Sequence, residues 1–276
     1  MSTLYVVATP IGNLEDVTLR ALRVLKEVSL IAAEDTRKTR RLLTRYGITT
    51  PLTSYYEHNK LTKLGNILER LASGEVALVS EAGMPGISDP GYELVVAAIA
   101  AGVSVVPVPG ASAVVTALAV SGLPTDRFVF LGFLPSRAVA RRRFLREISG
   151  ERGTLVVYEA PHRLRASLGD ILEVLGDRRI AVCRELTKLH EEVFRGTVSQ
   201  AVAHFTAPRG EFTLIIDGGK GAAEPPSNAS NAGIEEKLGE MRRSGKTLKQ
   251  AIDALAGRAG LSRKELYRTW LKQKRG

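Results

Sequence analysis

The chain has 276 residues, 44% of them hydrophobic and 25% charged, so it is long enough for one large or two medium globular domains. A single cysteine, Cys183, excludes an intramolecular disulfide and a cysteine metal cage, and no two histidines have zinc-ligand spacing with a third partner. We therefore expect no metal, and Cys183 to be a core residue. The net charge of +10 predicts an anionic partner, with nucleic acid ahead of a membrane surface.

The N-terminal segment and the longest uncharged stretch bear on whether the protein is secreted or inserted in a membrane. MSTLYVVATPIGN has no basic region before its apolar run, which stops at Pro10, so it does not resemble a signal peptide. Gly102 and Pro107 interrupt the uncharged stretch between Glu93 and Asp126, which argues against one unbroken membrane-spanning helix. We expect a cytoplasmic protein with no membrane partner.

The first 120 residues alternate between short runs rich in β-branched residues and longer segments of helical periodicity. The expected strands are Leu4–Thr9, Leu30–Ala33, Val76–Ser80 and Val103–Val108. The expected helices are Thr18–Glu27, Thr36–Tyr46, Lys60–Ala72 and Pro90–Ala101. This alternation predicts an α/β domain with a parallel sheet covered on both faces, in which ligands bind beyond the carboxyl ends of the strands.

A second α/β domain is expected over residues 121–218. Its strands should be Phe128–Phe133, Thr154–Tyr158, Ile180–Arg184 and Phe212–Asp217, with helices at Ala138–Ile148 and His162–Leu175. A hairpin-like pattern around Glu191–Gly196 predicts a mixed sheet. Residues 219–233 have the Gly, Pro, Ser and Asn content of a flexible linker.

A basic tail over residues 234–276 completes the predicted organisation. Residues 229–276 contain twelve Lys and Arg against five Asp and Glu, so they carry +7 of the net charge. Three helices are expected, at Ile234–Arg243, Leu248–Arg258 and Arg263–Lys272, and the last two resemble a helix-turn-helix. We expect Tyr267 or Trp270 to pack this small bundle, and Arg263, Lys264 and Arg268 to bind RNA.

Three loops follow strands of the first sheet and contain Gly and Pro: Thr9-Pro10-Ile11-Gly12-Asn13, SEAGMPGISDPG (80–91) and Pro109-Gly110-Ala111-Ser112-Ala113. They should converge at one edge of the sheet. Neither a P-loop nor a dinucleotide fingerprint occurs in them, and all three lack Lys and Arg, which argues against polyphosphate. The carboxylates Glu81 and Asp89 favour a ligand with a cationic centre, such as the sulfonium of S-adenosylmethionine.

Seven segments, in order along the chain, resemble a known family: TPIGNLEDVTLRAL, AAEDTRKTRRLL, the second loop with SDPGY, VVPVPGASA, GFLP, YEAPHRL and RELTKLHEEVFRG. The family is the ribosomal RNA small subunit methyltransferase I group of the tetrapyrrole methylase superfamily. The resemblance implies two α/β domains with S-adenosylmethionine in the cleft between them. It also implies methylation of the ribose 2′-hydroxyl of a cytidine in the decoding region of 16S rRNA, in the 30S subunit, and a homodimer.

The resemblance also implies which residues bind the cofactor. They are those of the three loops: Thr9, Pro10, Gly12, Ser80, Glu81, Ala82, Gly83, Met84, Pro85, Ser88, Asp89, Pro109, Gly110, Ala111, Ser112 and Ala113. Two positions depart from the S-D-A-G-T-P that is common in the family, because this chain has Glu81 and Met84 there. If the missing threonine hydroxyl bonds the cofactor, its loss costs about 1 kcal/mol.

A ribose hydroxyl is a poor nucleophile while protonated, so a base or a cation should lie within hydrogen-bond reach of it. Asp35, Glu159 and Lys188 are the candidates, each at the carboxyl end of an expected strand; Asp35 or Thr36 could instead cap the next helix. Other basic and polar side chains at strand ends and in the 137–146 run are candidates for RNA binding: Arg37, Lys38, His58, Asn59, Arg141, Arg142, His162 and Arg163.

Two other functions fit part of the sequence. A tetrapyrrole methyltransferase would account for the loops, but a compact anionic porphyrinoid needs no basic helical tail. A non-catalytic RNA-binding assembly factor that retains the cofactor pocket is supported only by the departures at Glu81 and Met84. A methylation assay separates the three.

Overall fold

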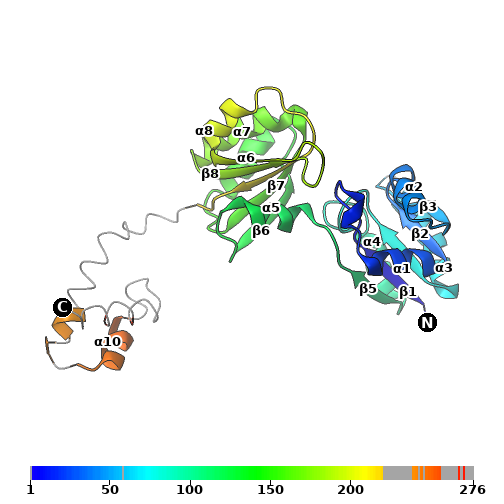
Figure 1. Cartoon of the computed structure of the whole chain (residues 1–276), viewed down its shortest axis with the longest axis horizontal. Coiled ribbons are helices and arrows are strands. Elements are labelled where there is room, and N and C mark those ends of the chain that lie inside the picture. The colour runs from blue at the N-terminus through cyan, green and yellow to red at the C-terminus, as the bar shows by residue number, and fades with distance from the viewer. Residues whose placement is uncertain are drawn as a thin grey trace. The chain divides into compact units, whose positions relative to one another are not determined.

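A computed structural model describes residues 2–57, 59–219, 238–241, 243–244, 246–255, 267 and 270 (Figure 1). Residues 1–219 form one compact unit, and residues from 220 onward form a second, so each is described by itself. The first unit contains two five-stranded sheets. In the part of the chain that the structure describes, no helix is both long and apolar enough to cross a membrane.

The first sheet is entirely parallel, as the alternation of strands and helices predicted. Its strands lie in the order β3-β2-β4-β1-β5 and span β1 Thr3–Val7, β2 Leu30–Ala33, β3 Leu52–Ser54, β4 Val76–Val79 and β5 Ser104–Val108. Sequence reasoning missed β3, a three-residue edge strand that follows Pro51 and has no fully buried residue. A strand this short and partly polar has no readable alternation.

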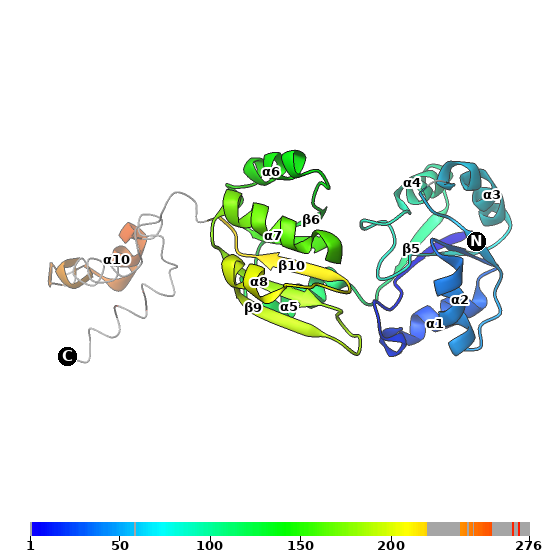
Figure 2. The ribbon, with the colours of Figure 1, turned by 90° about the horizontal axis from the view of Figure 1, so that it is seen from above.

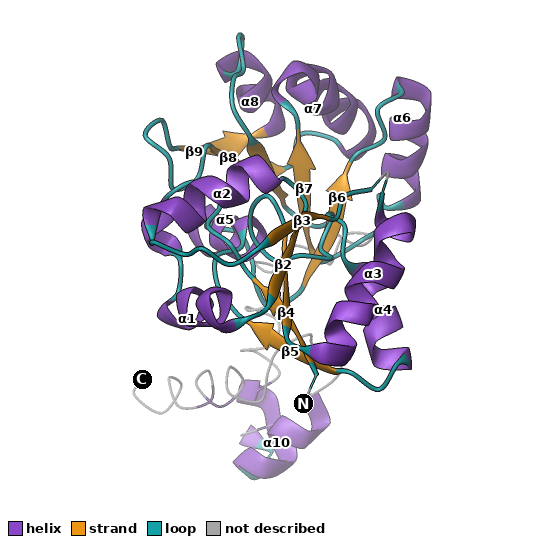
Figure 3. Ribbon diagram, turned by 90° about the vertical axis from the view of Figure 1, so that its right-hand side faces the viewer, coloured by secondary structure: helices purple, strands orange, loops and turns teal. Residues whose placement is uncertain are grey.

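Helices cover both faces of this sheet (Figure 3). On one face lie α1 Leu19–Glu27 and α2 Thr36–Arg45, whose Leu25 and Leu42 pack with Val7 and Ala77. On the other face lie α3 Lys60–Ser73 and α4 Tyr92–Ala100. Because successive strand residues point to opposite faces, neighbours in β1 and β4 supply both cores. Because the strands are parallel, the three Gly-containing loops emerge at one edge of the sheet, and the short helix η1 Leu14–Asp16 follows the first of them.

The second sheet is mixed, as the hairpin-like pattern predicted. Its order is β6-β7-β10-β8-β9, with strands β6 Phe128–Phe133, β7 Thr154–Glu159, β8 Arg179–Arg184, β9 Glu192–Thr197 and β10 Phe212–Ile216. Strand β10 lies in the centre, antiparallel to both β7 and β8, and β6 pairs parallel with β7. All five residues of its sequence FTLII are buried, with no alternation between buried and exposed positions, because helices cover both of its faces.

The helices of the second sheet are α5 Ala113–Ser121, α6 Ala138–Glu147, α7 Pro161–Leu175 and α8 Val198–His204 (Figure 2). Helices α6, α7 and α8 share a core with Val182 of β8, while α5 packs with Ala181 and Cys183 on the opposite face. The boundary expected at residue 120 would leave α5 with the first sheet, whereas its partners are in the second. Cys183 is buried, as expected of a core residue.

In the second unit the described residues include helix α10, Leu248–Leu255. Thr247 is its N-cap residue, because the amide of Gln250 donates to the Thr247 hydroxyl while the Gln250 side chain accepts from the Thr247 amide. Trp270 is buried and Tyr267 is exposed, so one of the two aromatic residues packs the tail as expected. The predicted linker beyond Gly219 and most of the predicted last helix lie outside the described residues.

Candidate functional site: a cleft at the strand ends

The first and second loops are joined by backbone hydrogen bonds. The amide of Thr9 donates to the carbonyl of Gly83 over 2.9 Å, and the Gly83 amide donates back to Thr9 over 3.0 Å. The Thr9 hydroxyl also donates to the carbonyl of Ser80, at 3.3 Å. Gly83 has a φ of +81°, a left-handed conformation that favours glycine. The pairing therefore depends on glycine at this position.

The third loop lies against the other two. A Cβ added to Gly110 would lie 2.9 Å from the Cβ of Ala8, so the close approach of these two segments requires glycine. The carbonyl of Ala111 is 3.6 Å from where a Cβ of Gly83 would be. The three loops therefore converge, as their positions after parallel strands predicted.

These loops form one wall of a cavity of about 380 Å³, whose opposite wall comes from the second sheet. Tyr158 and Glu159 of β7, Cys183 and Leu186 at the end of β8, and Phe212 of β10 belong to that wall. We call this space the first cavity. Its described lining contains five carboxylates and no Lys, Arg or His: Glu34, Glu81, Asp89, Glu159 and Glu211.

Two of these carboxylates titrate abnormally because they are partly removed from water. Burial, reinforced by the negative charge of Glu34, raises the pKa of Asp89 to about 6, and a hydrogen bond with Ser80 only partly opposes this. Burial also raises the pKa of Glu34, against the pull of Lys38. Glu34 accepts a hydrogen bond from the amide of Glu81 at 3.1 Å. The first cavity therefore has a concentration of negative charge that a cationic ligand would relieve.

The rest of the first cavity is mostly apolar and aromatic, with Ser112 and Thr213 as polar exceptions. The Phe133 and Tyr158 rings lie 5.6 Å apart between centroids, and burial together with the charge of Asp89 raises the pKa of Tyr158 to about 12. Burial raises the pKa of Cys183 to about 11, so its thiol stays protonated. An apolar wall facing carboxylates suits S-adenosylmethionine, which combines an adenine ring with ammonium and sulfonium charges.

The predicted cofactor residues fall into three groups. Those that line the first cavity are Glu81, Ala82, Gly83, Met84, Asp89, Ser112 and Ala113. A second cavity, of about 400 Å³, is lined by Thr9, Pro10, Gly12 and Ser80, and also by Glu81 and Ala82. Pro85, Ser88, Pro109, Gly110 and Ala111 line neither; the Ser88 hydroxyl lies instead against Gly132 of β6, 3.3 Å from where its Cβ would be.

Sequence reasoning missed most of the wall that the second sheet contributes. The residues of the first cavity that were not predicted as cofactor or catalytic residues are Ile11, Glu34, Ile87, Phe133, Tyr158, Ala160, Pro161, Cys183, Leu186, Glu211, Phe212 and Thr213. The family segments YEAPHRL and RELTK contain some of them and were a usable signal. Glu211 and Phe212 follow Gly210 in an ordinary strand start, and no pattern distinguishes them.

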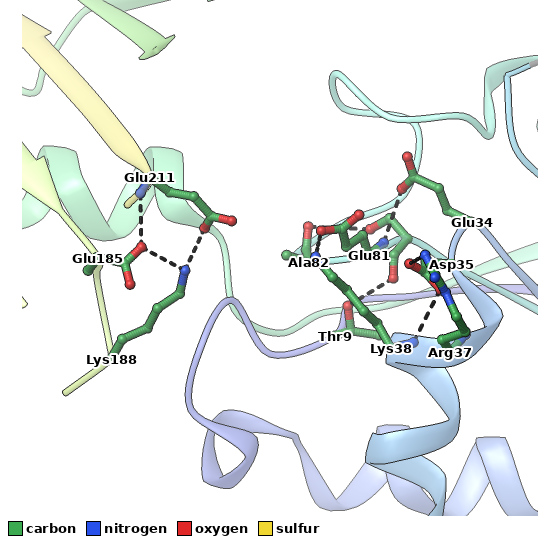
Figure 4. Close-up of polar contacts among 11 residues, drawn as sticks. Thr9, Glu34, Asp35, Arg37, Lys38, Glu81, Ala82, Glu185, Lys188 and Glu211 are labelled. Atoms are coloured by element: carbon green, nitrogen blue, oxygen red, sulfur yellow. Dashed lines mark hydrogen bonds and ion pairs between the residues drawn. The ribbon is translucent and has the colours of Figure 1, made fainter. Parts of the chain in front are cut away.

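The three catalytic candidates lie in different surroundings, and Figure 4 shows two of them, Asp35 and Lys188. Asp35 caps α2, accepting from the amides of Arg37 and Lys38 at 2.8 and 3.3 Å, and it lines neither cavity. Glu159 lines the first cavity but is buried, bonded to the Ser167 hydroxyl and the Ala160 amide and ion-paired with Arg163. Both arrangements are those of structural carboxylates.

Lys188 is the candidate that lines the second cavity. Its Nζ lies 2.8 Å from Glu211 and 3.0 Å from Glu185, and the side chain lines the second cavity (Figure 4). Burial lowers the pKa of Lys188, but the hydrogen bonds to Glu211 and Glu185 outweigh it and raise the pKa overall. Lys188 is therefore a cation at neutral pH, positioned beside Glu211, which lines both cavities.

Several predicted RNA-binding residues are engaged within the protein. The structure corrects the prediction that Arg141 binds RNA. Arg141 is buried, and its Nε and a terminal nitrogen lie 2.6 and 2.5 Å from Asp170, so the two residues form an internal ion pair. Arg163 pairs with Glu159 and donates to the carbonyl of Leu134. The Asn59 side chain accepts from the Tyr56 amide at 2.7 Å and holds a turn.

The remaining RNA-binding candidates differ in exposure. Arg37 is exposed beside Asp35, Lys38 pairs with Glu81, and Arg142 is shared between Asp170 and Glu173. His162 is exposed in the first turn of α7. His58, Arg263, Lys264 and Arg268 lie outside the described residues.

Comparison with known proteins gives a consistent result. The family model described as Tetrapyrrole (Corrin/Porphyrin) Methylases matches residues 3–202. "Ribosomal RNA small subunit methyltransferase I" of Halalkalibacterium halodurans is 50% identical over 273 residues, which is 96% of this chain and 93% of the relative. The protein of the same name from Thermotoga maritima is 51% identical over 221 residues, covering 99% of that relative but 79% of this chain. The crystal structure of uroporphyrin-III-C-methyltransferase from Thermus thermophilus has a TM-score of 0.56 at 21% identity, covering 78% of this chain and 94% of that one, and so shares the fold.

Proposed function

This chain belongs to the ribosomal RNA small subunit methyltransferase I family, within the tetrapyrrole methylases, and from that premise we propose that it methylates the ribose 2′-hydroxyl of a cytidine in 16S rRNA. The methyl donor of the family is S-adenosylmethionine. The observation that carries the proposal is the first cavity, whose described lining combines five carboxylates with aromatic and apolar residues and includes no basic side chain.

The residues of the first cavity have distinct parts in holding the donor. When bound, S-adenosylmethionine supplies an activated methyl group on a positively charged sulfur. Asp89, Glu34 and Glu81 provide negative charge to attract its cationic centres, while Leu186, Tyr158 and Phe212 provide an apolar wall. Backbone groups of the Gly83 and Ser112 loops complete the wall without adding a positive charge. Positioning of this kind can supply most of the catalysis in a displacement.

Activation of the acceptor hydroxyl falls to Lys188 and Glu211. Glu211 lines both cavities and Lys188 lines the second, so this ion pair lies where an acceptor entering from the second cavity would meet the donor. The Lys188 ammonium stabilises negative charge that develops on the ribose oxygen, and the Glu211 carboxylate accepts its proton. This assignment replaces Asp35 and Glu159, whose carboxylates are occupied by structural partners.

The test is transfer of a labelled methyl group from S-adenosylmethionine to 30S subunits that lack the modification, followed by mass spectrometry of the nucleosides. We expect 2′-O-methylcytidine and no transfer to uroporphyrinogen. A methylated base would contradict the 2′-hydroxyl as acceptor. Transfer only to uroporphyrinogen would make the protein a tetrapyrrole enzyme, and transfer to neither would support a non-catalytic assembly factor.

We also propose that the protein is a homodimer that works in the cytoplasm, where 30S subunits are found. One exposed apolar stripe supports a dimer: Tyr92, Val96 and Ile99 of α4 are 70%, 45% and 61% exposed, and their spacing places them on one helix face. Light scattering of the full chain should give twice the chain mass. The variant Ile99→Lys should be a monomer, and a wild-type monomer would contradict the proposal.

A further inference from the structure

The second cavity differs from the first in its charge. It adjoins the first, since Ile11, Glu81, Ala82 and Glu211 line both. Unlike the first cavity, it has cationic side chains in its lining: Lys38 and Arg41 from α2 and Lys188 from the second sheet's side of the cleft. Two connected spaces of different charge suit a reaction between a cationic donor and an anionic acceptor.

A stripe of cations continues outward from this second cavity along α2. Lys38, Arg41 and Arg45 are three and four residues apart, so they share one face of the helix. Arg45 lines a third, open hollow that shares Gly12, Leu14 and Lys188 with the second cavity. The stripe therefore runs from the open hollow to the lining of the second cavity.

The two outer members of the stripe have no structural task in the described part of the chain. Arg41 and Arg45 are exposed, and neither side chain makes an ion pair or hydrogen bond with any described residue. Lys38 differs, because it pairs with Glu81. Helix α2 contains five Lys and Arg and no Asp or Glu, and the acidic residues that line the second cavity and the open hollow are Glu15, Glu81 and Glu211. Arg41 and Arg45 are therefore available to bind an anionic ligand, because few acidic side chains line the hollows beside them.

We propose that Arg41 and Arg45 bind consecutive phosphates of the single RNA strand that carries the acceptor ribose, and that the acceptor nucleotide enters through the second cavity. The inference rests on the proposed function and adds to it the surface by which the strand is held. Arginine suits this task because its planar fork of donors matches phosphate oxygens.

The test uses the full chain and a single-stranded RNA oligonucleotide with the sequence of the decoding region, with no donor required. The double variant Arg41→Gln/Arg45→Gln is compared with Arg20→Gln/Arg70→Gln, which removes the same charge from exposed residues that line none of these three hollows. We expect the first variant to lose RNA affinity at least fivefold. The slope of the logarithm of its binding constant against the logarithm of salt concentration should become shallower by about 1.4, or about 0.7 per phosphate contact. The second should bind like wild type.

Two further readouts keep the outcomes distinct. The Arg41→Gln/Arg45→Gln variant should bind S-adenosylmethionine with unchanged affinity, and its thermal unfolding should match that of wild type. Equal loss in both double variants, or unchanged RNA affinity in the first, would overturn the proposal. Competition by inorganic polyphosphate as strong as that by RNA of equal charge would also overturn it, because the site would then recognise any polyanion. Arg-dependent RNA binding without methyl transfer to any acceptor would contradict the proposed activity while supporting this surface.

Discussion

The backbones of Thr9 and Gly83 exchange two hydrogen bonds, of 2.9 and 3.0 Å, and so join the first two loops of the cleft. These two hydrogen bonds depend on the left-handed backbone conformation of Gly83, which also faces the third loop at Ala111. A single residue thus positions backbone from all three loops.

Gly83→Val should therefore weaken S-adenosylmethionine binding by tenfold or more, about 1.4 kcal/mol, because the side chain strains the left-handed backbone at the cavity wall. Calorimetric titration measures the affinity. The matched control is Gly102→Val, which has a similar φ of +72° and no atom within 4 Å of the added Cβ. Both variants should lose similar stability; equal loss of donor affinity in both would show that the cavity is misplaced.

Donor binding should weaken as the pH falls through about 6, where Asp89 takes up a proton and loses the charge that attracts the donor. Binding of S-adenosylhomocysteine, which lacks the sulfonium charge, should change less over the same range. Titrations between pH 5 and 8 measure both. The variant Asp89→Asn should remove most of the pH dependence, and a dependence that persists in it would assign the titration to another group.

The same residue predicts a pH effect on stability. Burial raises the pKa of Asp89 in the folded state to about 6 from 3.8, so the folded chain retains a proton that the unfolded chain releases. The stability that protonated Asp89 gives the folded chain, relative to the ionised form, is present in full below pH 4 and is lost as the pH rises through 6. Asp89→Asn should thus unfold at a higher temperature than wild type at pH 7.5, with little difference at pH 4. The reverse order in scanning calorimetry would contradict the raised pKa.

Lys188→Met should lower kcat by about 100-fold or more with saturating RNA, because a cation that stabilises the developing oxyanion is removed. S-adenosylmethionine affinity should stay within twofold, and Lys188→Arg should recover part of the rate. Single-turnover measurements of methyl transfer separate an effect on the chemical step from an effect on binding. A rise in KM with unchanged kcat would make Lys188 an RNA-binding residue instead.

Arg141→Ala should lower the free energy of unfolding by about 3 kcal/mol, since it leaves the buried Asp170 without its main partner. The control Arg143→Ala removes an arginine whose side chain is 80% exposed, and should cost less than about 0.5 kcal/mol. Urea denaturation measures both. If Arg141→Ala were as stable as Arg143→Ala but bound RNA less tightly, the original expectation of an RNA contact would be restored.

Periodicity and composition determined a large part of this protein from the sequence alone. Strands that alternate with helices predicted the parallel first sheet, and the hairpin-like pattern around Glu191–Gly196 predicted that the second sheet is mixed, in which β9 pairs antiparallel with β8. The loops with Gly and Pro but no Lys or Arg predicted a cleft that avoids positive charge, and the first cavity has that lining. These features are local, because each depends on residues close together in the chain.

Only the tertiary structure decided which side chains the cleft receives and which are buried elsewhere. The 137–146 run looked like one basic surface, but the turn of α6 directs Arg141 inward to Asp170, 29 residues further along the chain. Glu211 reaches the cleft because β10 lies between β7 and β8, an order that local patterns do not encode. Sequence spacing specifies faces within one element, whereas contacts between distant elements depend on how those faces pack, and that packing placed Lys188 beside Glu211.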